Sequence, residues 1–199
     1  MAVPASRPPP RPRRGARPTC AAVRYSIGIA DGGAGAGVGK QDFSVYDYRA
    51  RRDYVTADVT ERNGRMGVKG SCLCGQIRYR INGPLTGTLN CHCTMCRKAH
   101  GAAFRTRAAV KTEDFEWLAG EHLLTRYQSS PGLHKMFCSV CGSNLVTIID
   151  SSPEWLGFPL GTLDDDPGVK PQFHVFVGSK APWHDITDDL PQWDEKPDQ

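Results

Sequence analysis

Seven of the eight cysteines in this 199-residue chain fall into three short clusters, and this clustering constrains the fold more than any other feature. The clusters are Cys72-Leu73-Cys74, Cys91-His92-Cys93-Thr94-Met95-Cys96 and Cys138-Ser139-Val140-Cys141. Thiolates prefer borderline or soft metals, and a tetrahedral set of sulfur ligands is typical of zinc or of an iron–sulfur cluster. Metal binding is a better first interpretation than disulfides, because no continuous apolar segment typical of an export signal follows the basic N-terminus. The spacing therefore predicts zinc, with disulfides and iron–sulfur as open alternatives.

The number of clustered cysteines predicts two different metal sites. Four of them form two pairs, and four protein ligands close a structural zinc site, whereas three protein ligands leave the open position of a catalytic one. The expected structural set is Cys72, Cys74, Cys138 and Cys141, and the expected catalytic set is Cys91, Cys93 and Cys96. Other partitions stay open, including one completed by His92. Because His92 lies between two ligands, we expect it to point away from the metal as a solvated side chain or one that supports the ligands.

Short runs of alternating apolar and polar residues, separated by glycine and proline, predict a mainly β fold. The expected strands are Gly75–Ile81, Thr86–Cys91, Ala102–Val110, Phe115–Leu118, Leu123–Tyr127, Lys135–Cys138, Asn144–Ile149, Trp155–Pro159 and Phe173–Val177. One short helix is expected over Thr94–His100. Gly142 fits the left-handed position of a metal-binding turn, where backbone N–H groups face sulfur.

The first third of the chain differs from the rest in composition and charge. Residues 1–66 hold 12 Lys and Arg against 6 Asp and Glu, a balance of +6, whereas residues 67–199 hold 13 against 15, a balance of −2. Proline and arginine dominate residues 1–20, and glycine dominates residues 31–39, which disfavours a packed core. We therefore expect a disordered basic leader over 1–66, containing an exposed Cys20, and a zinc domain over 67–199.

Charge and hydropathy also limit the partners. A transit peptide or a nucleic-acid-binding arm stays open for the leader, but the slightly acidic balance of residues 67–199 makes nucleic acid an unexpected partner for the domain. No apolar stretch approaches the roughly 18 residues that span a bilayer. We expect a cytoplasmic protein without a membrane partner.

The three clusters together resemble the glutathione-dependent formaldehyde-activating enzyme family, which includes centromere protein V-like proteins. The matching segments are Gly70-Ser71-Cys72-Leu73-Cys74-Gly75, Cys91-His92-Cys93-Thr94-Met95-Cys96-Arg97-Lys98, Phe137-Cys138-Ser139-Val140-Cys141-Gly142, Gly161-Thr162-Leu163-Asp164 and Ser179-Lys180-Ala181-Pro182-Trp183. The resemblance covers Gly70 to Asp194. It implies a zinc fold of several coiled antiparallel sheets, of the β-tent type, and the same division of the cysteines into a structural and a catalytic zinc site.

The resemblance also implies an activity, the condensation of glutathione with formaldehyde to S-(hydroxymethyl)glutathione, which is a carbon–sulfur lyase reaction in reverse. Arg97, Arg105 and Arg107 are then candidate substrate-binding residues, because guanidinium binds the carboxylates of glutathione well. Arg105 and Arg107 share one face of the expected strand, where solvated surface charges are an equally open interpretation. A non-catalytic zinc binding module of the centromere protein V type, or a structural zinc domain with an inert second site, are the alternative functions.

Overall fold

The computed structural model describes residues 67–197, so the predictions for the leader and for Cys20 lie outside the described residues. The strands in this part are β1 (Val68–Ser71), β2 (Arg78–Ile81), β3 (Thr86–Cys91), β4 (Arg105–Lys111), β5 (Phe115–Ala119), β6 (Leu124–Ser130), β7 (Leu133–Cys138), β8 (Asn144–Ile149), β9 (Trp155–Pro159) and β10 (His174–Val175). The helices are α2 (Thr94–His100) and the single 3-10 turns η2 (Thr112–Asp114), η3 (Glu121–Leu123), η4 (Leu160–Thr162) and η5 (Val177–Ser179). The mainly β prediction is confirmed.

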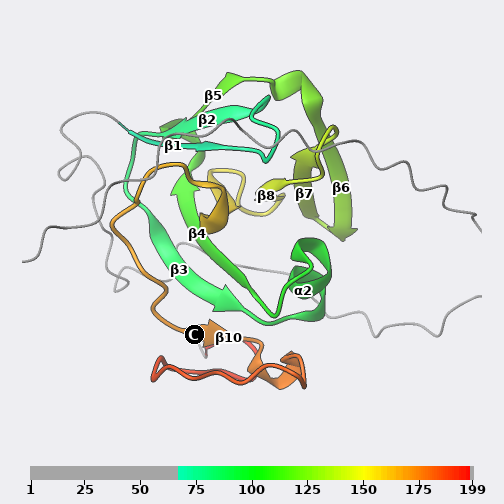
Figure 1. Ribbon diagram of the computed structural model, residues 1–199, viewed down its shortest axis with the longest axis vertical. Coiled ribbons are helices and arrows are strands. Elements are labelled where there is room, and N and C mark those ends of the chain that lie inside the picture. Colours follow the sequence, from blue (N-terminus) through cyan, green and yellow to red (C-terminus); the bar gives the residue numbers. More distant parts are fainter. Residues whose placement is uncertain (1–66, 198–199) are drawn as a thin grey trace, which may run out of the picture. The chain divides into compact units, whose positions relative to one another are not determined.

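The strands form two sheets (Figure 1). A three-stranded sheet has the order β1-β2-β5, and a seven-stranded sheet has the order β10-β3-β4-β9-β8-β7-β6. Neighbouring strands pair antiparallel, as short connections between consecutive strands favour, except that β10 runs parallel to β3. In the part of the chain that the structure describes, no helix is long and apolar enough to cross a bilayer.

The main core lies between the two sheets. Val68 and Tyr79 of the smaller sheet pack in one buried cluster with Val110 and Phe158 of the larger sheet. Tyr79 is fully buried and stacks on Phe115 at a ring-centroid distance of 4.9 Å. Burial of such aromatic and branched side chains is the main favourable term in folding. The core therefore fixes β1 and β2 against β4 and β9, and with them the loops that carry cysteines.

A second buried cluster lies beside β10 and contains Cys91, Cys93 and Cys96. The pairing of β10 with β3 sets Val175 opposite Cys91, so the C-terminal segment flanks the strand that ends in a candidate ligand. Helix α2 follows directly and has the predicted bounds. It ends at Gly101, which is in the left-handed conformation with φ of 57°, a common way to end a helix.

Candidate metal centre and adjoining cavity

Two glycine-containing turns bring four cysteines together. The N–H of Gly75 donates to the carbonyl of Cys72, and the N–H of Gly142 donates to that of Cys138, both at 2.8 Å. The φ angles of the two glycines are 72° and 76°, in the left-handed region that other residues adopt only with strain. The prediction for Gly142 is confirmed, and both turns direct their sulfurs to one point.

The sulfur positions fit a metal. The Sγ atoms of Cys72, Cys74, Cys138 and Cys141 all lie within 4.8 Å of one another. Cys74 Sγ is 3.4 Å from Cys72 Sγ and 3.9 Å from Cys138 Sγ. Sulfurs around a tetrahedral zinc, at about 2.3 Å from the ion, are about 3.8 Å apart, whereas a disulfide bond measures about 2.05 Å. All seven clustered cysteines are free thiols, so a metal site explains the first set better than disulfides do.

The four-cysteine set reaches the surface. Cys74 is exposed, and the neighbouring Leu73 and Val140 are 86% and 54% exposed. The backbone N–H of Ile77 donates to Cys72 Sγ at 3.3 Å. Burial raises the pKa of Cys141, but hydrogen bonds with Ser143 outweigh it and bring the pKa to about 6. Such donors favour thiolate, the form that binds metal.

The three-cysteine set is buried at the junction of β3 and α2. Its Sγ atoms also lie within 4.8 Å of one another. Cys91 ends β3, and Cys93 is the N-cap of α2, where its Sγ accepts the N–H of Cys96 at 3.3 Å. The exposed fractions of Cys91, Cys93 and Cys96 are 4%, 1% and 8%. The sequence C-H-C-x-x-C thus turns from strand to helix so that three sulfurs face one point.

The three buried thiols oppose one another's ionisation. Hydrogen bonding to Cys93 and then to Cys96 raises the pKa of Cys91 well above its usual range. Hydrogen bonding from Cys91 and then from Cys93 lowers the pKa of Cys96 well below its usual range. One thiolate therefore forms first and hinders the others, so a cation is needed before all three ionise. The donor set fits a divalent metal.

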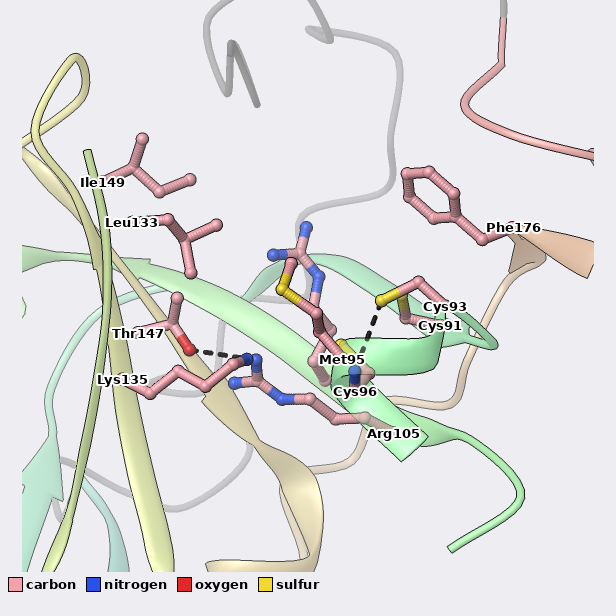
Figure 2. A pocket seen from close by; sticks show the side chains of 11 residues that line it. Cys91, Cys93, Met95, Cys96, Arg105, Leu133, Lys135, Thr147, Ile149 and Phe176 are labelled. Atoms are coloured by element: carbon pink, nitrogen blue, oxygen red, sulfur yellow. Dashed lines mark hydrogen bonds between the residues drawn. The ribbon is translucent and has the colours of Figure 1, made fainter. Parts of the chain in front are cut away.

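A cavity of about 40 Å³ adjoins these three sulfurs, as Figure 2 shows. The residues that line it are Cys91, Cys93, Met95, Cys96, Arg105, Arg107, Leu133, Lys135, Thr147, Ile149 and Phe176. This volume holds about three waters or a one-carbon molecule, because one water occupies roughly 10–15 Å³ of such a cavity. The cavity therefore admits only small groups.

Three cations line the cavity although its other walls are largely apolar. Arg105, Arg107 and Lys135 are only 4%, 6% and 7% exposed. The prediction that Arg105 and Arg107 share one face of a strand is confirmed. The interpretation as solvated surface charges is wrong, because both side chains are buried in a cavity that residues of β7 and β8 also line. Arg105 Nη1 donates to Thr147 Oγ1 at 3.0 Å. Burial is the main cause that lowers the pKa of Lys135.

The family model described as glutathione-dependent formaldehyde-activating enzyme matches residues 67–179, more than half of the chain. The chain belongs to this family. A relative from Halomonas elongata, named "Putative glutathione-dependent formaldehyde-activating enzyme", is 30% identical over 130 residues, which are 61% of this chain and 82% of the relative. A crystal structure of a Rhodobacter sphaeroides protein aligns with 63% of this chain and 98% of its own at 25% identity, with a TM-score of 0.42.

In this family member, Arg97 does not line the cavity. Its Nε donates to the carbonyl of His92 at 3.3 Å, and its side chain is half-buried. The next residue, Lys98, is exposed. Of the three arginines predicted to bind substrate, the structure thus brings Arg105 and Arg107 to the cavity, whereas Arg97 contacts the backbone of the cysteine loop.

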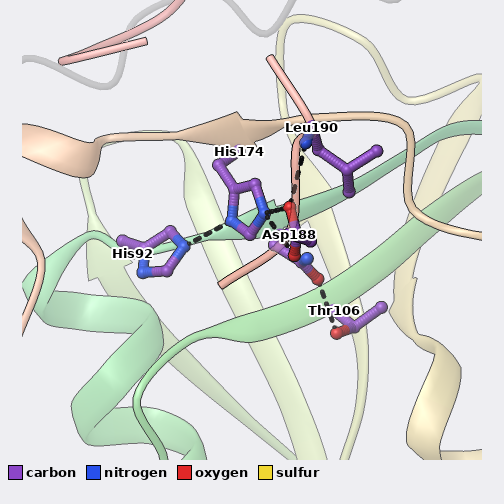
Figure 3. A network of polar contacts seen from close by, with 6 residues as sticks. His92, Thr106, His174, Asp188 and Leu190 are labelled. Atoms are coloured by element: carbon purple, nitrogen blue, oxygen red, sulfur yellow. Dashed lines mark hydrogen bonds and ion pairs between the residues drawn. The ribbon is translucent and has the colours of Figure 1, made fainter. Parts of the chain in front are cut away.

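His92 is buried in a chain of polar contacts that Figure 3 shows. Its Nε2 is 2.8 Å from His174 Nδ1, and His174 Nε2 is 3.1 Å from Asp188 Oδ1. The expectation of a solvated side chain is wrong, because β10 and the C-terminal segment cover His92. The alternative expectation, a histidine that supports the cysteine loop, fits these contacts. Burial, followed by the charge of His174, lowers the pKa of His92 to about 4. When both rings are neutral, His174 donates from Nε2 to Asp188 and accepts at Nδ1 the N–H of His92 Nε2.

Sequence reasoning missed Lys135 and Thr147. A signal existed, because Leu133 with Lys135 and Thr147 with Ile149 are spaced by two residues on β7 and β8, and all four line the cavity. The spacing alone does not say that these faces and the face of Arg105 meet. The strand order β4-β9-β8-β7 supplies that information.

Proposed function

We propose that this chain is a zinc-dependent enzyme that joins the thiol of glutathione to formaldehyde and forms S-(hydroxymethyl)glutathione. In the opposite direction the reaction is that of a carbon–sulfur lyase. One observation carries the proposal: three buried cysteines that leave one metal position open adjoin a small cationic cavity. Membership of the family and the name of the Halomonas relative support the same substrates.

Two zinc ions per chain fit the two all-sulfur donor sets. Cys72, Cys74, Cys138 and Cys141 would hold the structural ion, and Cys91, Cys93 and Cys96 would hold the catalytic ion. When bound there, the second ion would lower the pKa of a substrate thiol at the open position, so that a thiolate is present at neutral pH. Reduced thiol ligands are also consistent with the proposed cytoplasmic location.

The protein's own residues bring the two reactants together. The substrate thiol first loses its proton to water. A carbon–sulfur bond then forms between the thiolate and the formaldehyde carbon, the C=O π electrons move to oxygen, and the oxygen takes a proton back from water. Apolar walls from Leu133, Ile149 and Phe176 exclude bulk water and strengthen the electrostatic interactions inside. Holding two small reactants side by side removes much of the entropy cost of their encounter.

The positive charges favour an anionic thiol such as glutathione. The cavity accepts the thiol end and the aldehyde, and the rest of the tripeptide must extend outside it because of the cavity's size. Arg105 and Arg107 attract negative charge into the cavity. Arg97, beside the cysteine loop, is available to a carboxylate of the extended part of glutathione.

The test is the rate of exchange between formaldehyde and S-(hydroxymethyl)glutathione, measured by NMR at equilibrium so that the uncatalysed reaction is a measured background. We expect the zinc-loaded protein to raise the rate, Cys93→Ser to return it to background, and Cys20→Ser, a cysteine outside the clusters, to leave it unchanged. A zinc-loaded parent protein at the background rate would contradict the proposal and favour a non-catalytic binding module.

A further inference from the structure

Arg105 and Lys135 carry like charges yet line the same wall of the cavity. Arg105 comes from β4 and Lys135 from β7, and both side chains line the cavity, as Figure 2 shows. Within residues 67–197 neither side chain forms an ion pair with a carboxylate, and no side chain or carbonyl accepts a hydrogen bond from Lys135. Arg105 Nε is also buried without an acceptor in this part of the chain. Arg105 and Lys135 therefore lack the paired carboxylate that usually compensates the desolvation of a buried cation.

The neighbouring cysteines compensate only part of this charge. Three thiolates with a divalent ion carry a net charge of −1, whereas Arg105 and Lys135 together carry +2. Among the charged groups around Lys135, Cys96 supplies the largest attraction and Arg105 repels it. A small anion beside the open metal position therefore gains from both cations, in a cavity where apolar walls reduce screening.

In the proposed reaction the negative charge moves during bond formation. It starts on the thiolate sulfur and ends on the oxygen of the S–CH2–O⁻ group, two bonds away. Stabilisation of that oxygen accelerates the reaction, because it acts where charge develops. Buried donors beside the sulfur position meet this requirement, whereas the carboxylates of glutathione lie many bonds from its sulfur and extend outside a cavity of about 40 Å³.

We propose that Arg105 and Lys135 form an oxyanion site that receives the oxygen of the S–CH2–O⁻ group, with Thr147 holding the guanidinium in place. The proposal rests on the proposed function and assigns Arg105 to the reacting oxygen rather than to a glutathione carboxylate. The oxygen then takes a proton from water, and the product that carries the S–CH2–OH group leaves the site. In the reverse direction the oxygen loses this proton and the carbon–sulfur bond breaks. Thr147 is a positioning residue because its Oγ1 accepts the hydrogen bond of Arg105 Nη1 at 3.0 Å.

The test measures binding of small thiols rather than turnover. In protein loaded with Co²⁺ in place of zinc, a thiol that reaches the metal changes the visible absorption. Thioglycolate carries an anionic oxygen close to its sulfur, and 2-mercaptoethanol is a neutral thiol of similar size. We expect thioglycolate to bind about tenfold more tightly or better, as a charge-assisted hydrogen bond provides. Lys135→Met should remove this preference and change 2-mercaptoethanol binding by less than about twofold.

Matched variants separate the site from general charge and from misfolding. Lys98→Met removes an exposed lysine two residues from Cys96 and should keep the preference. Lys135→Arg keeps the charge and should also keep the preference for thioglycolate. Thr147→Val should weaken this preference, and it supplies the test if Lys135→Met fails to fold. In turnover, Lys135→Met should lower kcat much more than it changes KM. A parent protein without the preference, or a preference retained in both Lys135→Met and Thr147→Val, would overturn the proposal.

The two proposals fail in different ways. A parent protein that prefers thioglycolate but does not accelerate the exchange of glutathione and formaldehyde would contradict the proposed function and leave the anion site standing. A parent protein that accelerates the exchange without any preference for thioglycolate would contradict the oxyanion site alone.

Discussion

The four-cysteine and three-cysteine sets have opposite environments. The complete set includes exposed Cys74 and adjoins exposed Leu73 and Val140, whereas all members of the incomplete set are buried. Four protein ligands complete the coordination of a zinc ion, so such a site tolerates water nearby. A site with three leaves the fourth position to whatever the surrounding cavity admits. Burial therefore accompanies the open metal position, because the set that lacks a fourth ligand is the one whose cysteines are all buried.

The two sets also join different parts of the core. Cys72 and Cys138 belong to the main core between the sheets, so their metal would link the β1–β2 hairpin to β7. The three-cysteine set belongs to the smaller cluster beside β10 and has all its ligands on one short segment. A metal in the first set closes a long loop of chain, and a metal in the second does not. We therefore expect the first metal to contribute more to folding.

The largest expected effect breaks the four-cysteine set. Cys138→Ser removes a fully buried ligand that is also part of the main core. Because a closed zinc site supplies folding free energy of roughly 10 kcal/mol or more, we expect this variant to lose cooperative thermal unfolding in circular dichroism. Ser139→Ala, at the exposed neighbouring position, should unfold as the parent does. A folded Cys138→Ser protein would show that the two sets do not differ as we infer.

The next effect concerns Phe176, which covers only the three-cysteine set. Phe176 lines the cavity with a φ of 58°, in the left-handed region that a residue other than glycine adopts with strain. We expect Phe176→Ala to lower the free energy of unfolding by about 3–5 kcal/mol through lost burial. Phe176→Gly should be more stable than Phe176→Ala by about 1 kcal/mol, because glycine removes the strain.

Urea unfolding of the two variants measures this difference. The usual order, in which the alanine variant is the more stable, would mean that the left-handed backbone at residue 176 is not strained. Both variants should retain the metal of the four-cysteine set, because Phe176 does not pack against that core.

The smallest effect concerns the support that the C-terminal segment gives to the three-cysteine set. The Leu190 N–H first, and His174 second, lower the pKa of Asp188, so the folded state favours its carboxylate. Asp188→Asn should lower Tm by about one or two degrees near pH 7, as expected for an exposed group. Because a lowered pKa stabilises the fold above the unfolded-state value, this difference should shrink as the pH falls below about 4.

Thermal melts of Asp188→Asn between pH 3 and 7 measure this effect, with Asp189→Asn as the control at the exposed neighbouring position. A Tm difference that grows as the pH falls would contradict the sign of the pKa shift. An equal effect at residue 189 would show that net charge, rather than the contact with His174, is responsible.

Much of the fold could be predicted from the sequence because its strands are short and alternate. The bounds of β3, β8, β9 and α2 match the expectation, since buried faces and turn residues both mark them. The expected strand at Gly75–Ile81 begins only at Arg78, because residues 72–77 form the cysteine turn, with Cys72 N–H bonded to Ile77 carbonyl. Strand β1 was not predicted, as its four residues include Gly70 and show little periodicity.

The cysteine sets could be predicted from spacing alone because their members are close along the chain or occur in matched pairs. The cavity could not be, because its cations come from strands that are separated in sequence. Arg105 and Lys135 meet only through the strand order of the larger sheet, and Asp188 reaches His92 only through His174. Contacts of this kind depend on register, which period-two patterns leave undetermined.

Metal content tests the central claim, a complete site and an incomplete one, most directly. Zinc per chain and the thermal melt should be measured together for the parent, Cys93→Ser and Cys20→Ser. We predict about two zinc ions for the parent and Cys20→Ser, and about one for Cys93→Ser, which should still unfold cooperatively. A parent with a single zinc ion, or a Cys93→Ser protein that is unfolded, would contradict the division into a structural site and an open one.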